Sequence, residues 1–292
     1  MEFKTLDIAT IPEVRSFLRY INTNTCDYTI GGMFMWRKYF NMQYVVANGA
    51  YFSRLYDSNG KEFYNLPLSE DIEASLIWLV DKLRKGNQEI RFCTVPESFI
   101  PIFEKHFSIK RIHAQTEYFD YLYATEDLVN LRGKRYSAQR NLISQFERNA
   151  GVWSLKEIHQ EDIVPIRDFF LENCIVKQGE STAQEEQEMV LEVLDNFESY
   201  EMTGGFLTSD DDIVGFSLGE ILNDTFFVHI EKASRSIKGS YQMLAHQIAC
   251  NFADGKASYI NREEDMGDLG LRKAKEAYHP ITMLKKFTVE VY

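Results

Sequence analysis

The sequence lacks the features that would place it among secreted, disulfide-bonded or membrane-spanning proteins. Its four cysteines lie far apart and form no Cys-x-x-Cys pair, which fits a reducing compartment and neither a zinc site nor a disulfide scaffold. Residues 1–7 contain no apolar core after a basic start, so no signal peptide is predicted. The most membrane-like run, residues 30–36, is too short to cross a bilayer. We therefore expect a cytoplasmic protein without a membrane-spanning segment.

Motifs of several enzyme classes are also missing. The chain contains no Gly-x-Ser-x-Gly elbow, phosphate-loop lysine motif or pair of metal-ligand histidines. This disfavours serine hydrolases, nucleotide hydrolases and metalloenzymes, and no metal site is predicted. An excess of positive charge is absent too, because the formal net charge is −12. That charge argues against general DNA binding, although a local basic patch remains compatible with it.

What the chain does have is length and apolar bulk. Its 292 residues exceed the usual length of one domain, and hydrophobic residues make up 45% of them. Such a chain buries two cores and is not intrinsically disordered. Its 21 phenylalanines and 16 tyrosines suit sheets that face helices.

The order of predicted elements indicates a repeated plan. Strand-like runs at 43–47 and 50–56 flank Asn48-Gly49, a hairpin signal, and helical spacing follows over 69–85. Each half reads as a strand, a helix or helices, a three-strand meander, a helix, a strand, a helix and a strand. The halves are not visibly alike, so element order alone predicts an α/β (α+β) fold of two tandem N-acetyltransferase-like domains. We expect each to be a mixed, largely antiparallel sheet flanked by helices, over residues 1–130 and 131–292, with the site in the second.

The segment from Asn261 to Pro280 is the richest candidate for a site. It combines charges of both signs with two glycines directly after a strand-like run, and a strand that opens into a loop and a basic helix is a common ligand site. The alternative is a solvated loop and helix cap. The side chains expected to hold a charged substrate are Arg262, Asp265, Arg272 and Lys275.

Three further residues suit acyl transfer, which needs a proton acceptor and an acid for the leaving group. His229 and Glu231 lie two apart on one strand and therefore point to one face, with Glu220 on the preceding strand near them. Tyr278 follows the late helix and is a candidate acid. The alternatives are a satisfied structural His–Glu pair and a core aromatic residue.

Two basic segments are candidates for anion or donor binding. A loop before a helix contains Arg235, Lys238, Gly239 and Ser240, and a helix start favours an anion. The run 131–149 reads as a basic helix that includes Arg135 and Arg140, whose guanidinium groups suit phosphate and carboxylate contacts. Ordinary helix starts and solvated faces look similar, so both alternatives stay open. The glutamate-rich run 180–201 is predicted to be the wet face of an amphipathic helix.

The runs Gly-Lys-Arg…Gln-Arg-Asn-x-Ile-x-x-Phe and Asn-Arg-Glu-x-Asp-x-Gly-x-x-Gly-Leu-Arg-x-Ala-Lys-x-x-Tyr-x-Pro carry a resemblance. They look like an uncharacterised bacterial family related to the C-terminal domain of phosphatidylglycerol lysyltransferase. Residues 228–233, 239–241 and 26–36 fit the same pattern, so the resemblance covers nearly the whole chain. It implies two tandem acetyltransferase-like domains akin to peptidoglycan peptide aminoacyltransferases, in which an activated amino acid passes from its transfer RNA to an amine or hydroxyl.

The resemblance makes an acyltransferase, specifically an aminoacyltransferase, the leading hypothesis, with a small-molecule or tRNA-linked acyl donor. A coenzyme A thioester is the alternative donor, but the usual loop is imperfect because Arg235 is followed three places later by Lys238, not glycine. No membrane-spanning region is attached, which disfavours a lipid acceptor. The rival of another class is a non-catalytic binding module of the same fold, for an anionic metabolite or an RNA end. The sequence does not determine an oligomeric state.

Overall fold

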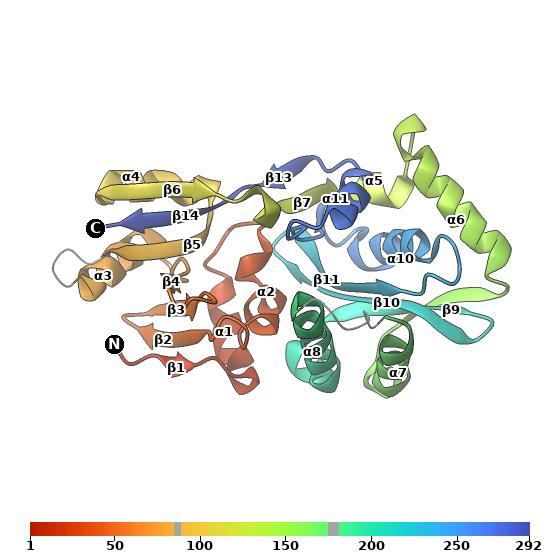
Figure 1. The fold of residues 1–292 in the computed structure, drawn as a ribbon, viewed down its shortest axis with the longest axis horizontal. Helices are drawn as coiled ribbons and strands as arrows, with labels where there is room; N and C mark the ends of the chain where they lie inside the picture. The colour runs from red at the N-terminus through yellow and green to blue at the C-terminus, as the bar shows by residue number, and fades with distance from the viewer. Residues whose placement is uncertain (85–88, 175–180) are drawn as a thin grey trace. The chain divides into compact units, whose positions relative to one another are not determined.

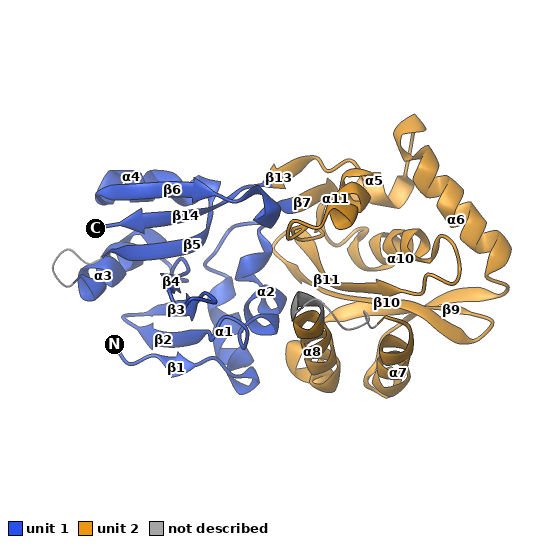
Figure 2. Cartoon of the chain, in the orientation of Figure 1, with its two compact units in different colours: residues 1–120, 284–292 blue, residues 121–283 orange. Residues whose placement is uncertain are grey.

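A computed structural model describes residues 1–84, 89–174 and 181–292. The chain forms two compact units, residues 1–120 with 284–292 and residues 121–283 (Figure 2). The predicted last residue of the helix over 69–85 and the predicted first residue of the run 180–201 lie outside the described residues. No helix within the described ranges is long and apolar enough to span a bilayer.

The first unit is built on a seven-stranded sheet in the order β1-β2-β3-β4-β5-β14-β6 (Figure 1). The strands are β1 Lys4–Thr5, β2 Gln43–Ala47, β3 Ala50–Tyr56, β4 Glu62–Tyr64, β5 Ile90–Pro96, β6 Ile109–Ala114 and β14 Lys286–Val291. Its α-helices are α1 Ile11–Leu18, α2 Ile30–Met35, α3 Ile72–Leu83 and α4 Ile100–His106. Aromatic pairs join the layers, because Trp78 of α3 stacks on Phe52 and Phe103 of α4 packs on Phe92.

The second unit contains a seven-stranded sheet in the order β13-β7-β12-β11-β10-β9-β8. The strands are β7 Asp120–Ala124, β8 Trp153–Glu157, β9 Thr203–Ser209, β10 Asp212–Leu222, β11 Thr225–Ala233, β12 Tyr259–Asn261 and β13 Thr282–Leu284. The helices are α5 Thr125–Asn130, α6 Ser137–Asn149, α7 Ile163–Asn173, α8 Ser181–Asp195, α9 Phe197–Tyr200, α10 Ser240–Ile248 and α11 Leu269–Glu276. Helices α10 and α7 lie on opposite faces of this sheet (Figure 1).

The two halves of the chain exchange a strand. Strand β7 follows β6 in sequence but joins the second unit's sheet beside β12, and β14 follows β13 but lies between β5 and β6 of the first unit. The compact units therefore differ from the predicted division at residue 130, since residues 121–130 belong to the second unit and residues 284–292 to the first. The order of elements along the chain does not reveal this exchange, because it assigns each strand to its own half.

Strand β4 pairs in parallel with β5, and β11 pairs in parallel with β12. The β11–β12 register ends at Phe227 and Asn261, although β11 continues to Ala233. The two strands therefore diverge at this point, and the residues that follow lie beside α10. With this topology the predicted tandem N-acetyltransferase-like fold is confirmed.

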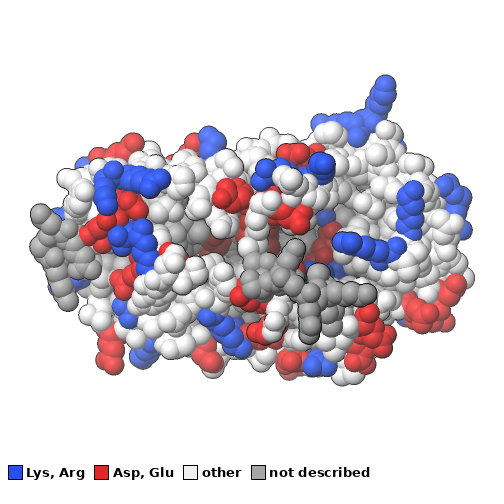
Figure 3. Space-filling view, viewed as in Figure 1, with Lys and Arg blue, Asp and Glu red and all other residues white. Residues whose placement is uncertain are grey.

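Helices α6 and α8 are amphipathic and bury the apolar faces that the sequence predicts. In α6 the side chains of Gln139, Ile143 and Phe146 are buried, and so is that of Ala150 directly after the helix. In α8 the apolar residues from Met189 to Leu194 are largely buried, whereas Glu186 and Glu188 are exposed. Acidic and basic side chains are interspersed on the face shown in Figure 3.

Candidate functional site

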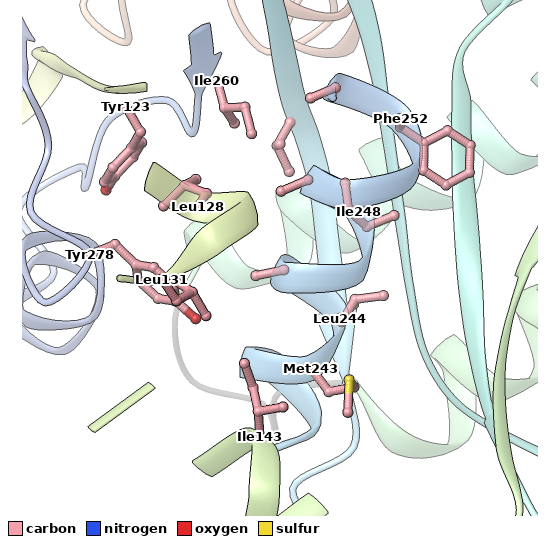
Figure 4. Packing of buried hydrophobic residues seen from close by; sticks show 14 of the residues in the cluster. Tyr123, Leu128, Leu131, Ile143, Met243, Leu244, Ile248, Phe252, Ile260 and Tyr278 are labelled. Atoms are coloured by element: carbon pink, nitrogen blue, oxygen red, sulfur yellow. The ribbon is translucent and has the colours of Figure 1, made fainter. Parts of the chain in front are cut away.

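A narrow pocket of the second unit lies where β11 and β12 part. Its lining residues come from α5, β11, β12, α10 and the end of α11, and they are Leu128, Val228, Glu231, Ala245, His246, Ile248, Ile260, Arg262 and Tyr278. Figure 4 shows Leu128, Ile260 and Tyr278 on one side of α10 and Phe252 on the other. Three predicted site residues, Glu231, Arg262 and Tyr278, therefore share one pocket.

Glu231 and Arg262 form the charged wall of this pocket. Arg262 Nη2 donates to Glu231 Oε1 at 2.6 Å, and both side chains are only 13% exposed. Burial opposes the guanidinium charge, but the carboxylate of Glu231 outweighs it and raises the pKa of Arg262 above its usual value. The other terminal nitrogen, Nη1, is buried and has no hydrogen-bond partner among the described residues. An unpaired buried donor is costly.

Tyr278 lines the pocket and is also part of the hydrophobic core of the second unit. The guanidinium of Arg262 lies 4.8 Å from the centre of its ring. Burial raises the pKa of Tyr278 to about 12. The phenol therefore keeps its proton at neutral pH, which a proton donor requires. The two sequence interpretations of Tyr278, core residue and candidate acid, are compatible in this position.

His229 does not line the pocket, because two carboxylates clasp its ring. Nδ1 lies 2.7 Å from Glu263 Oε1 and Nε2 lies 3.0 Å from Glu220 Oε1, with the His229 side chain 0% exposed. Burial disfavours the imidazolium, but the hydrogen bonds and charges of the two glutamates prevail and raise the pKa of His229 to about 10. An imidazolium has no lone pair for a proton. The expectation that His229 accepts an amine proton therefore does not fit this geometry.

The raised pKa of His229 gives a direct prediction. The imidazole ¹⁵N resonances should report a doubly protonated ring from pH 6 to pH 8, with deprotonation near pH 10. Because the folded pKa lies above the ordinary 6.5, the stability from this clasp is fully present below pH 6.5 and is lost as the pH rises through about 10. A midpoint for His229 near the ordinary 6.5 would contradict the clasp.

The side chains of Asp265, Arg272 and Lys275 form hydrogen bonds within the second unit. Asp265 accepts hydrogen bonds from Tyr121 Oη at 2.6 Å and from Arg272 Nε and Nη2 at 2.8 and 2.9 Å. The hydrogen bond from Arg272 is the main cause that lowers the pKa of Asp265 to about 2. Lys275 is buried and donates to the Glu264 carbonyl. These contacts tie the loop to α11, so the three residues hold Arg262 in place and do not line the pocket.

The predicted anion-binding residues lie outside the pocket as well. Arg235 and Lys238 are exposed on the loop between β11 and α10, and Ser240 Oγ donates to the Ile237 carbonyl. Arg135 pairs with Asp127 at 2.7 Å, and Arg140 donates to the carbonyls of Leu131 and Gly133. These contacts join Arg135 to α5 and Arg140 of α6 to the turn before it, and a donor-binding role for either segment stays a proposal.

The structural requirement for glycine at position 239 can be tested. Its φ is +95°, and an added Cβ would overlap the Leu142 carbonyl oxygen, whereas Gly255 has φ +69° with open space around it. Both alanine variants should lose about 1–2 kcal/mol from the left-handed backbone. Gly239→Ala should lose about 1–3 kcal/mol more from overpacking against α6. Urea unfolding measures both, and equal losses would show that contact with Leu142 is unimportant.

Sequence reasoning missed His246 and Glu263, whereas it expected Glu220 near His229. His246 lines the pocket from α10, and Glu220 and Glu263 hold His229. Glu263 has a left-handed φ of +57°, and its backbone N donates to Asn261 Oδ1 at 2.6 Å. A single histidine within an apolar helix carries no sequence signal for a pocket. Glu263, in contrast, lies in the late charged segment and directly follows Arg262.

One family model matches nearly the whole chain. A family model described as phosphatidylglycerol lysyltransferase, C-terminal, matches residues 18–290. An uncharacterized protein of Mycoplasmoides gallisepticum is 24% identical over 190 residues, which are 63% of this chain. The match spans 59% of that protein's own length.

Solved structures match over almost the whole chain. A conserved protein of unknown function from Bacteroides thetaiotaomicron is 30% identical, with a TM-score of 0.90 and 100% of both chains covered. The structure of L-PGS from Bacillus licheniformis has a TM-score of 0.66 at 12% identity, with 95% of this chain and 90% of that chain covered. At that identity the second match establishes a shared fold.

Proposed function

The chain belongs to the family of the phosphatidylglycerol lysyltransferase C-terminal domain, and from this premise we propose that it is an acyltransferase that moves an aminoacyl group. The donor is an activated amino acid, in the form of an aminoacyl-tRNA, and the acceptor is an amine or a hydroxyl. The family description names a lysyl transfer, which supports transfer of an amino acid as the reaction class. The site is the pocket beside α10.

The observation that carries the proposal is the unpaired Nη1 of Arg262 on the wall of that pocket. In acyl transfer the carbonyl oxygen gains negative charge in the transition state. A hydrogen-bond donor that is already fixed beside this oxygen lowers the barrier. Glu231 orients the guanidinium through Nη2. Asp265, Arg272 and Lys275 fix the loop that carries Arg262, so the donor needs little reorganisation.

The roles of Glu231 and Tyr278 are proposed from the bonds that form and break during transfer. The acceptor nitrogen or oxygen attacks the ester carbonyl carbon, and its proton passes to the carboxylate of Glu231. The ester C–O bond breaks, and the leaving oxygen takes the proton of the Tyr278 hydroxyl, which Tyr278 regains as Glu231 returns its own. The raised pKa of Tyr278, about 12, keeps it protonated before the step. The role proposed for Arg235 and Lys238, which are exposed on the loop before α10, is to contact phosphates of the donor.

The test is transfer from a panel of charged tRNAs to amine and hydroxyl acceptors, with product detected by mass spectrometry. Coenzyme A thioesters form a second panel, because a coenzyme A-dependent transferase differs only in the donor. We expect turnover with an aminoacyl-tRNA. The absence of transfer and of binding across both panels would defeat the proposal.

One observation favours the non-catalytic alternative. The carboxylate of Glu231 is already engaged by Arg262 at 2.6 Å, and a binding module for an anionic metabolite or RNA end needs no free base. The alternatives separate in cells that depend on the protein. A pure binder keeps its biological effect in the Glu231→Gln and Tyr278→Phe variants, whereas a transferase loses it.

A further inference from the structure

Two side-chain bridges connect β11 to the loop after β12, beyond the point at which the strands diverge. The backbone pairing of β12 with β11 ends at Asn261. Further along β11, His229 Nδ1 lies 2.7 Å from Glu263 Oε1. Two residues later, Glu231 accepts a hydrogen bond of 2.6 Å from Arg262. Side chains therefore continue the connection that backbone hydrogen bonds make up to Asn261, and they do so through two consecutive loop residues.

The backbone of these two loop residues is bonded elsewhere. The amide of Arg262 donates to the Tyr121 carbonyl and the amide of Tyr121 donates to the Glu263 carbonyl, both at 3.1 Å. Glu263 has a left-handed φ of +57°, and its amide donates to Asn261 Oδ1 at 2.6 Å. Such a backbone conformation persists in a non-glycine residue only where surrounding contacts hold it. The bond from the Glu263 carboxylate to His229 is one of these contacts.

The imidazolium of His229 is itself fixed on its other side. Its Nε2 lies 3.0 Å from Glu220 Oε1 on β10, and the ring stacks on Phe227. The side chain of His229 is 0% exposed and that of Glu220 is 6% exposed, whereas that of Glu263 is 25% exposed. Of the two carboxylates, Glu263 therefore has the easier route to water if the ring is removed.

From these contacts we infer that His229 is a positioning residue, which fixes Glu263 and through it the neighbouring Arg262 beside Glu231. The ring touches no reacting group, and its two N–H groups only donate to glutamates. When the bond to Glu263 is lost, the carboxylate turns to water and the turn at Glu263 loosens. The guanidinium of Arg262 then loses its fixed direction. The consequence for transfer rests on the proposed function, but the fixation of Arg262 is measurable without any substrate.

The test is the guanidinium signal of Arg262 in the full chain, labelled with ¹⁵N-arginine and observed at neutral pH. A guanidinium fixed by a carboxylate rotates slowly and gives separate Nη signals, whereas a free one gives a single averaged signal. We expect separate signals in the wild-type chain and an averaged signal in His229→Ala and in Glu263→Ala. The Arg262→Lys variant assigns the signal. Arg272, which donates to Asp265 at 2.8 and 2.9 Å, is the internal control and should keep its signals.

A conservative variant separates this role from a general effect on the fold. The amide oxygen of glutamine still accepts from Nδ1, so Glu263→Gln should keep the wild-type signals of Arg262. In the transfer assay Glu263→Ala should lose about 10²-fold in kcat, the size of loss that a misplaced group causes. Its KM should change little, and Glu263→Gln should remain close to wild type.

The outcomes are distinguishable from those of the proposed function. Separate Arg262 signals in Glu263→Ala would overturn the inference, and that variant decides the question if His229→Ala does not fold. Loss of the Arg272 signals as well would overturn it too, because the effect would then be a general loosening. An averaged Arg262 signal with unchanged kcat would refute the role in transfer. An averaged signal in Glu263→Ala, with no transfer by the wild-type chain, would support the positioning and defeat the proposed function.

Discussion

A Glu231→Gln variant is expected to lose acyl transfer by about 10²–10⁴-fold, the range for removal of a positioned proton acceptor. The amide oxygen of glutamine still accepts from Arg262 Nη2, so the 2.6 Å contact and the fold should persist. The loss should appear in kcat, because a neutral amide holds the guanidinium but takes up no proton. Single-turnover transfer from a charged tRNA at neutral pH measures it.

The matched control is Glu157→Gln, at the exposed end of β8 in the same sheet. This variant should retain wild-type turnover. Near-UV circular dichroism and the melting temperature should be unchanged in both variants. A Glu231→Gln enzyme within about threefold of wild type would show that another group takes the proton.

A Lys286→Met variant is expected to lose about 3–5 kcal/mol of unfolding free energy, the cost of removing one partner from a buried ion cluster. Lys286 Nζ lies 2.9 Å from Asp27 and 2.8 Å from Asp120. Its side chain is 3% exposed and that of Asp120 is 0% exposed. Without the ammonium, Asp120 keeps the amide of Cys26 at 2.7 Å as a donor but loses its counter-charge.

The same cluster explains why we assign no metal here. Among the described residues, Cys26, Asp27 and Asp120 bring potential ligand atoms within 4.8 Å of one another. The Lys286 ammonium already supplies the positive charge between the two carboxylates. Burial raises the pKa of Asp27 to about 6 against the attraction of Lys286, and the ammonium compensates one of the two carboxylates.

The neighbouring lysine is the control for this prediction. Lys285 is 48% exposed and pairs with Glu97 at 2.8 Å, and Lys285→Met should change stability by only about 0–1 kcal/mol. A second substitution, Asp120→Asn, should restore part of the loss in Lys286→Met, because it removes the orphaned charge. Equal denaturation midpoints for the two single lysine variants in urea would contradict the buried cluster.

Local patterns predicted most of the elements correctly. The hairpin around Asn48-Gly49, strand β11 and the buried side of α6 are visible in sequence because alternation and helical spacing are local properties. The strand exchange is not visible. Whether β14 joins the first or the second sheet depends on partners far away in sequence, such as Asp120 and Asp27 for the Lys286 at its start.

By itself, the sequence predicted a reaction class to test and a set of candidate residues, of which Glu231, Arg262 and Tyr278 line one pocket. The tertiary structure alone decided which polar groups are free. Two glutamates close on His229, and Asp265 binds Arg272, whereas Arg262 Nη1 and His246 Nδ1 have no hydrogen-bond partner in the part of the chain that the structure describes. The reason is physical, because a residue type states what a side chain can donate or accept, and only its neighbours in space state what remains unpaired.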